Sequence, residues 1–115
     1  MTTIALEMTM ERACFLLRIK KERLADYLKA HDPVWPEMLD VMRNAGIRNY
    51  SLFVQEDGLI VGYMEGANIA ESLAQLGATD VNRRWQERMA PYFEGGSGDL
   101  SRDKPAWLRQ YFHMP

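Results

Sequence analysis

The chain of 115 residues is 47% hydrophobic and 26% charged, with a formal net charge of −2 at pH 7. This length is enough for one small domain with a modest core, and the slightly acidic balance argues against a surface that binds nucleic acid or an anionic membrane. Cys14 is the only cysteine, which excludes an intramolecular disulfide bond and is typical of a protein of the reducing cytoplasm.

The chain is expected to divide into an N-terminal extension, residues 1–11, and a single domain, residues 12–115. The first ten residues include Glu7 and lack both a basic region and a long apolar core, so they do not have the pattern of a signal peptide. No stretch approaches the roughly 20 apolar residues that a membrane span needs. We therefore expect a soluble, cytoplasmic protein.

The first elements of the domain are expected to be a strand and two helices. Residues 12–19 form an apolar run, which predicts a strand with Cys14 as a buried thiol. Residues 20–30 have helical spacing, and Pro33 disfavours helix at the residue before it, so this helix should end near His31. Asp32 is expected to cap a second helix, whose first turn tolerates prolines and which stops near Gly46.

Two strands are predicted next, over residues 47–55 and 59–65, joined by a hairpin turn at Asp57-Gly58. Helical segments over residues 69–76 and 81–89, a Gly-rich loop over 94–104 and a last strand over 106–113 complete the chain.

This order of elements predicts the fold class. It is typical of an α+β, ferredoxin-like fold, with a four-stranded antiparallel sheet and helices on one face. The other face of the sheet would be bare and apolar, so we expect a homodimer in which two sheets pack face to face across a two-fold axis.

The most informative pair of side chains is Tyr27 and His31, which lie four residues apart and so on one face of a helix. Imidazole titrates near neutral pH, and a helix C-terminus favours its charged form. An acid beside a hydroxyl suits proton transfer on a small polyhydroxy compound. A histidine that only caps carbonyls at the helix end would show the same spacing.

Several other kinds of site are absent from the sequence. His31 and His113 are the only histidines, so no metal-binding cluster is expected. No Gly-rich phosphate loop follows a strand, and no nucleophile elbow is present. The expected chemistry is proton transfer without a metal or an organic cofactor, or no catalysis.

Four motifs in order resemble the L-rhamnose mutarotase family. The run YLKAHDPVWPE at residues 27–37 looks like the signature of that family, and three further segments agree with it: GIRNYS at 46–51, DVNRRW at 80–85 and YFHMP at 111–115. The resemblance runs from about residue 12 to residue 115, nearly the whole chain.

This resemblance implies a homodimeric enzyme that interconverts the α and β anomers of L-rhamnose or a closely related aldose. It assigns His31 as the proton donor and Tyr27, Tyr50 and Trp85 as residues that bind the sugar. Ring opening needs only acid–base catalysis, worth ~10²–10⁴ in rate. The hydroxyls of tyrosines bind sugar oxygens, while the face of Trp85 suits the C–H-rich side of a pyranose.

The residues also allow structural interpretations. Tyr27 could be an ordinary residue of an amphipathic helix, Tyr50 an ordinary strand aromatic and Trp85 a core residue; Trp35 we assign mainly to packing. His113, on the expected last strand, could approach the site but is a weaker candidate than His31.

One position departs from the family pattern, because Gln86 stands where many members have a second tryptophan. That change could alter which sugar is held.

Two alternative functions are a cofactor-free or haem-linked monooxygenase of the dimeric ferredoxin-like type and a non-catalytic small-molecule-binding domain.

Overall fold

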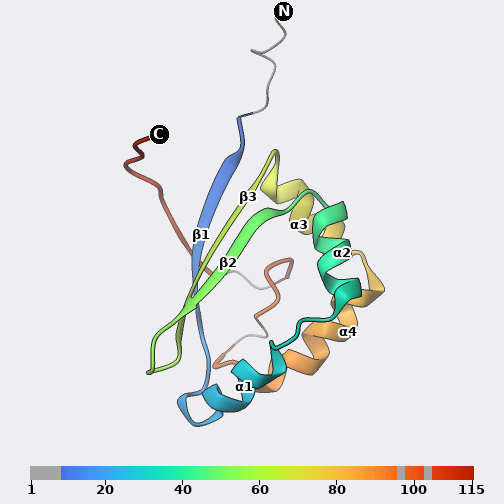
Figure 1. The fold of residues 1–115 in the computed structure, drawn as a ribbon, viewed down its shortest axis with the longest axis vertical. Helices are drawn as coiled ribbons and strands as arrows, with labels where there is room; N and C mark the ends of the chain where they lie inside the picture. The colour runs from blue at the N-terminus through green and yellow to red at the C-terminus, as the bar shows by residue number, and fades with distance from the viewer. Residues whose placement is uncertain (1–8, 96–97, 103–104) are drawn as a thin grey trace, which may run out of the picture.

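The structure, a computed structural model, describes residues 9–95, 98–102 and 105–115. Most of the expected N-terminal extension and part of the loop over 94–104 lie outside these residues. The described part contains a four-stranded antiparallel sheet with the order β2-β3-β1-β4, and Figure 1 shows the helices on one side of it. The strands are β1 (Glu11–Arg18), β2 (Arg48–Val54), β3 (Leu59–Gly66) and β4 (Ala106–Leu108).

The helices fall into two groups along the chain. A short 3₁₀ turn, η2 (Lys21–Arg23), leads into α1 (Leu24–Ala30), and α2 (Pro36–Asn44) follows before the hairpin. After β3 come α3 (Ile69–Gly77), α4 (Asp80–Met89) and the 3₁₀ turn η3 (Ala90–Tyr92). The predicted α+β class and antiparallel sheet are confirmed. None of the described helices is long and apolar enough to cross a membrane.

The core lies between the sheet and the helices. Along β3, Ile60, Gly62 and Met64 are buried while the residues between them are only partly covered, as the two-residue period of a strand requires. Phe15 of β1 lies opposite Gly62. A Cβ atom at Gly62 would be 2.1 Å from Cζ of Phe15, so this position needs glycine for the aromatic ring to pack flat on the strand.

Two predicted boundaries were wrong. Asp32 does not cap the second helix: α2 begins at Pro36 with Trp35 as its N-cap. Proline holds the preceding residue out of the helical conformation and fits the first helical position, where no N–H donor is needed. The backbone N–H of Asp32 instead donates to the Lys29 carbonyl at 3.1 Å and continues the end of α1. The prediction that the first helix ends near His31 is confirmed, since His31 is its C-cap.

The last strand is also shorter than predicted. β4 pairs with β1 over three residues only and ends at Leu108. The residues that follow point away from the core, and Tyr111 is 91% exposed. Figure 1 shows this C-terminal segment on the side of the sheet away from the helices. Residues 109–113, which were predicted to extend this strand, have no sheet partner within the described part of the chain.

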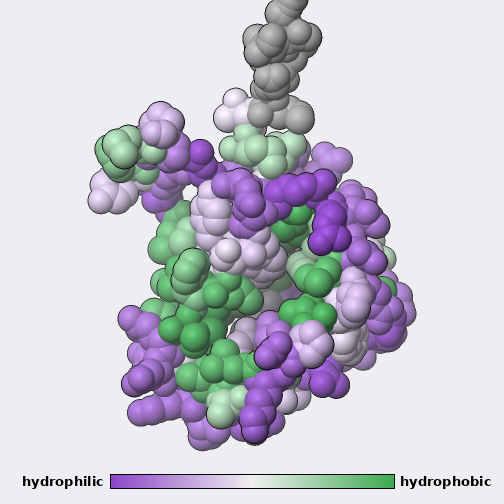
Figure 2. Space-filling view, viewed as in Figure 1, coloured by the Kyte–Doolittle hydropathy of each residue, from purple (hydrophilic) through white to green (hydrophobic). Residues whose placement is uncertain are grey.

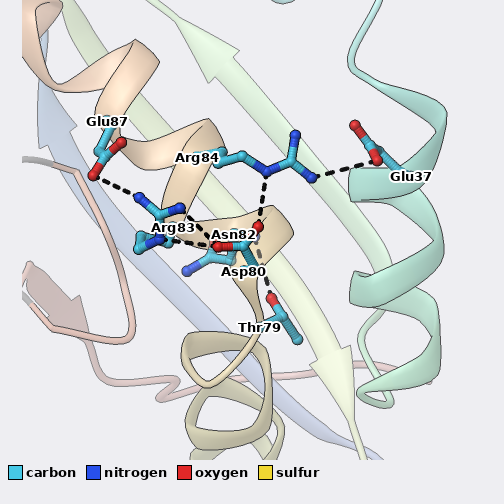
Figure 3. A network of polar contacts seen from close by, with 7 residues as sticks. All are labelled: Glu37, Thr79, Asp80, Asn82, Arg83, Arg84 and Glu87. Carbon is cyan, nitrogen blue, oxygen red and sulfur yellow. Dashed lines mark hydrogen bonds and ion pairs between the residues drawn. The ribbon is translucent and has the colours of Figure 1, made fainter.

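A network of charged side chains joins α4 to α2 (Figure 3). Arg84 lies 3.0 Å from Asp80 in its own helix and 3.6 Å from Glu37 at the start of α2. Exposed ion pairs are individually weak. They lie on the solvent-facing side of α4, and the next residue, Trp85, lies on the inner side of the helix, where it is 6% exposed.

The face of the sheet away from the helices carries apolar side chains. Register places Cys14, Leu16 and Val61 on this face, together with Phe53 and Leu108. Phe53 is 63% exposed, and Figure 2 shows apolar residues gathered over the strands. Cys14 is half-buried here, so the prediction of a buried thiol was wrong: the side chain points to the open face of the sheet.

Candidate active site

A cavity of about 260 Å³ lies between the sheet and the helices. It brings together three of the four predicted site residues: His31 from the end of α1, Tyr50 from β2 and Trp85 from α4. Tyr27 does not line it. Most of the remaining wall is apolar: Val34, Met38, Leu39, Met42, Ile47, Leu52, Met64, Leu73, Leu76 and Leu100.

His31 stands where α1 ends and is packed between two aromatic rings. Its ring centroid is 4.4 Å from that of Tyr27 and 5.4 Å from that of Trp85. Its Nδ1 lies 3.4 Å from the Tyr27 carbonyl oxygen. Because that carbonyl can only accept, the contact assigns the proton of neutral imidazole to Nδ1 and leaves the lone pair on Nε2.

The charge of His31 differs from the prediction. Burial lowers its pKa below the ordinary 6.5, and the contact with the Tyr27 carbonyl opposes this only in part. The carbonyl at the helix C-terminus does favour the charged form, as expected, but the cost of removing the imidazolium from water outweighs it. At neutral pH the imidazole is therefore uncharged and able to accept a proton.

The two tyrosines are hydrogen-bond donors that stay protonated. Burial raises the pKa of Tyr27 to about 12. Burial also raises the pKa of Tyr50, and the neighbouring Tyr27 phenol raises it further. Tyr27 is 3% exposed and lies beneath His31. Tyr50 lines the cavity and Tyr27 does not, so Tyr50 is the tyrosine placed nearer to a ligand.

Trp85 and Gln86 are consecutive residues of α4 that both line the cavity. The Trp85 ring meets the Trp35 ring edge-on at 5.0 Å. Trp35 itself does not line the cavity, in keeping with its assignment to packing. Nε2 of Gln86 donates to Oδ1 of the buried Asn82 at 3.1 Å, which fixes the orientation of the Gln86 amide.

Asp99 also lines this cavity and was not predicted. It lies in the polar loop before β4 and is only 4% exposed. Loop composition alone does not show where a carboxylate will lie in the fold, so the sequence contained no usable signal for it.

His113 does not join the site. It lines a wider hollow of about 510 Å³ with Arg12, Tyr63 and Glu65, on the open face of the sheet. The expectation that it could approach His31 was therefore wrong within this chain, because the sheet lies between the two hollows. Among the described residues, no group of three or more His, Cys, Asp or Glu side chains could hold a metal ion.

The chain belongs to the L-rhamnose mutarotase family, whose model matches residues 12–114. An L-rhamnose mutarotase from Burkholderia ambifaria is 34% identical over 105 residues, which cover 91% of this chain and 99% of the relative. One from Jannaschia sp. is 32% identical over 107 residues, covering 92% of this chain and all, 100%, of the relative.

Two solved structures share the fold. An L-rhamnose mutarotase from Formosa agariphila superposes with a TM-score of 0.74 at 21% identity, covering 91% of this chain and 99% of the other. Tetracenomycin F2 cyclase from Streptomyces glaucescens, a polyketide cyclase, superposes with a TM-score of 0.59 at 21% identity, covering 91% and 97%. At this identity the two matches show the fold alone.

Proposed function

We propose that this protein is a sugar mutarotase that interconverts the α and β anomers of L-rhamnose, or of a closely related aldose, by acid–base ring opening. The observation that carries the proposal is the convergence of His31, Tyr50 and Trp85 on one cavity, in a chain whose relatives are L-rhamnose mutarotases. The cavity volume, about 260 Å³, is near the lower end of small-molecule sites and suits a single monosaccharide. Residues 12–115 form the catalytic domain in this proposal, and residues 1–11 an extension.

His31 is the proton donor to the ring oxygen, and its neutral resting state explains where that proton comes from. Nε2 first accepts the proton of the anomeric hydroxyl as the C1–O5 bond breaks and the C1 aldehyde forms. The resulting imidazolium then protonates O5. The anomeric oxygen and O5 are both bonded to C1 in the closed ring, so Nε2 of His31 can reach both oxygens. Rotation about C1–C2 and the reverse steps on the other face of the aldehyde give the second anomer.

The aromatic residues hold the sugar during this exchange. The Tyr50 hydroxyl donates to a sugar oxygen, and Trp85 offers an apolar surface to the ring. We keep Tyr27 in the proposed site as its second tyrosine; it lies behind His31 and beside Tyr50. Because the pKa values of both phenols are raised, both hydroxyls stay protonated near neutral pH. They can donate hydrogen bonds to the sugar but cannot act as proton acceptors in the reaction.

Anomer exchange measured by saturation-transfer NMR tests the function. We expect the wild-type protein to accelerate exchange of L-rhamnose and His31→Ala to lower the rate constant by about 10²–10⁴-fold, the range for one acid–base group. His113→Ala is the matched control, because that histidine lies on the other face of the sheet, and it should exchange like the wild type. Equal rates with and without wild-type protein would refute the proposal.

The homodimer is part of the proposal. The strand order β2-β3-β1-β4 supports a ferredoxin-like fold, and its open face has the composition of an interface, with Phe53, Val61 and Leu108 spread across it on β2, β3 and β4. Charged pairs stand toward the ends, such as Arg18 with Asp57 at 3.6 Å. An apolar centre with a polar rim is the usual anatomy of a subunit contact. The dimer would be an α/β barrel formed from two sheets.

Sedimentation velocity tests the dimer. The wild type should sediment as twice the chain mass of 13.3 kDa, and Phe53→Glu should shift it to the monomer by placing a charge among the apolar side chains of that face. Glu56→Gln, in the hairpin turn, is the control and should remain dimeric. A wild-type protein that is monomeric at micromolar concentration would contradict the packing of two sheets.

Family membership favours the mutarotase over the monooxygenase and the non-catalytic binding domain. A cytoplasmic location stays our expectation from the single cysteine.

A further inference from the structure

We propose that Asn49 is a positioning residue for the sugar site: it maintains a bulge in β2 that lets Tyr50 and Ile47 face the cavity together. This inference rests on the proposed function, in which Tyr50 binds the sugar, and it adds a residue that acts through Tyr50. Asn49 precedes Tyr50 in β2 but does not itself line the cavity. It is exposed, so packing in the core does not explain its conformation.

The bulge is an extra residue in β2. The pairing of β2 with β3 changes register between Arg48 and Ser51, where Asn49 and Tyr50 stand opposite the single residue Met64. Two residues opposite one is the arrangement of a β-bulge, which disrupts the ladder locally and re-aims the side chains beside it. The bulge therefore lies directly at the tyrosine that is proposed to bind the sugar.

The extra residue brings two cavity residues onto one face of the sheet. Tyr50 and Ile47, the residue just before β2, both line the cavity although they are three positions apart. Side chains of an unbroken strand alternate between its faces, so residues at this spacing would face opposite sides. Leu52, two positions after Tyr50, also lines the cavity, as regular alternation requires. The change of phase thus falls between Ile47 and Tyr50, where the bulge lies.

Asn49 provides the backbone conformation of the bulge. Its φ is +47°, and no other residue except glycine has a positive φ in the described part of the chain. Most side chains are crowded in this left-handed region, whereas asparagine is tolerated there. One common type of bulge has glycine in this conformation at its first position. Strained residues of this kind are concentrated at functional sites, where the surrounding structure holds them in place.

The side chain of Asn49 ties the bulge to the neighbouring strand. Its Nδ2 donates to Oε1 of Glu65 in β3 at 2.7 Å, and the Tyr63 hydroxyl donates to Oε2 of the same carboxylate at 2.5 Å. The hydrogen bonds from Tyr63 and Asn49 lower the pKa of Glu65, so the acceptor is ionised at neutral pH. Glu65 and Tyr63 line the hollow on the open face of the sheet. Asn49 therefore affects the cavity through the backbone of β2.

Asn49→Ala tests this role, because alanine disfavours a positive φ and cannot donate to Glu65. We expect the ring of Tyr50 to move and the KM for L-rhamnose to rise about threefold to tenfold, the value of one neutral hydrogen bond. The kcat should change less than about threefold, because His31 lies on another element. Asn49→Gly should recover most of the loss, since glycine adopts a positive φ without strain.

Ser51→Ala is the matched control. Ser51 pairs with Tyr63 in the regular part of β2, on the open face of the sheet, and follows Tyr50 directly. This variant should keep the wild-type KM. A KM for Asn49→Ala equal to that of the wild type, or equal to that of Asn49→Gly, would overturn the inference.

Two further measurements separate positioning from a general loss of structure. If Asn49 acts through Tyr50, adding Asn49→Ala to Tyr50→Phe should raise the KM by less than about twofold. The ring centroids of Tyr50 and Phe15 are 6.3 Å apart, so NMR of the ligand-free protein should show an NOE between the two rings. We expect this NOE to weaken in Asn49→Ala, to return in Asn49→Gly and to be unchanged in Ser51→Ala.

KM effects that multiply in the double variant, or an NOE that is unchanged in Asn49→Ala, would overturn the inference. Absence of anomer exchange by the wild type would instead overturn the mutarotase function. The NOE would then still report whether Asn49 positions Tyr50, because it needs neither sugar nor activity.

Discussion

Replacing Gln86 by Trp should change which sugars the protein prefers and should also lower its stability. Gln86 lines the cavity beside Trp85, so an indole would replace a polar edge of the sugar site by a large apolar surface. That surface favours the methyl group of a 6-deoxy sugar over a hydroxymethyl group. For a direct contact, the preference for L-rhamnose should rise by about 1–3 kcal/mol, or roughly 5–150-fold.

The stability change follows from Asn82. This residue is 1% exposed, and its Oδ1 accepts the hydrogen bond from Gln86. Tryptophan at position 86 cannot repeat that bond in the same geometry, which leaves a buried acceptor unsatisfied at a cost of about 1–3 kcal/mol. Gln86→Leu is the matched control: it should lose the same stability but gain much less preference for L-rhamnose, since it adds no aromatic surface.

Exchange rates for L-rhamnose, L-mannose, L-fucose and D-galactose, measured for all three proteins, provide the assay. Thermal unfolding of the same samples measures the stability term separately. Identical relative rates across the four sugars in the wild type and Gln86→Trp would refute the reasoning. They would show that the side chain at this position does not contact the ligand, despite its place in the cavity wall.

Three further outcomes are expected. The kcat/KM should fall as the pH drops, with a midpoint below 6.5. His31 has a lowered pKa and must be neutral to accept the anomeric proton. A midpoint above 7 would contradict the role of burial in lowering that pKa. Gly62→Ala should lower the free energy of unfolding by about 1–3 kcal/mol through overpacking against Phe15, and an unchanged urea midpoint would contradict the contact. Exchange should be unchanged after exhaustive chelation, whereas a loss restored by one added metal would refute acid–base chemistry without a metal.

Much of the architecture followed from local patterns in the sequence. Apolar runs, helical spacing and the Asp57-Gly58 turn predicted the order of elements, because these signals depend on neighbouring residues only. Boundaries were less certain where two local rules competed. Asp32 is a good helix cap, but Pro36 fits the first helical position better, and α2 begins there.

The site depended on tertiary structure to a greater degree. Spacing paired Tyr27 with His31, and the family resemblance added Tyr50 and Trp85, but only the packed fold brings residues of α1, β2 and α4 to one cavity. Helix-end electrostatics predicted a charged His31, whereas burial among aromatic rings lowers its pKa. Asp99 and His113 are the clearest cases. Asp99 reaches the cavity in a loop where Gly98 packs on Phe93, whereas the sheet separates His113 from the cavity. Desolvation and long-range contacts depend on residues distant in the chain, so local sequence patterns could not determine them.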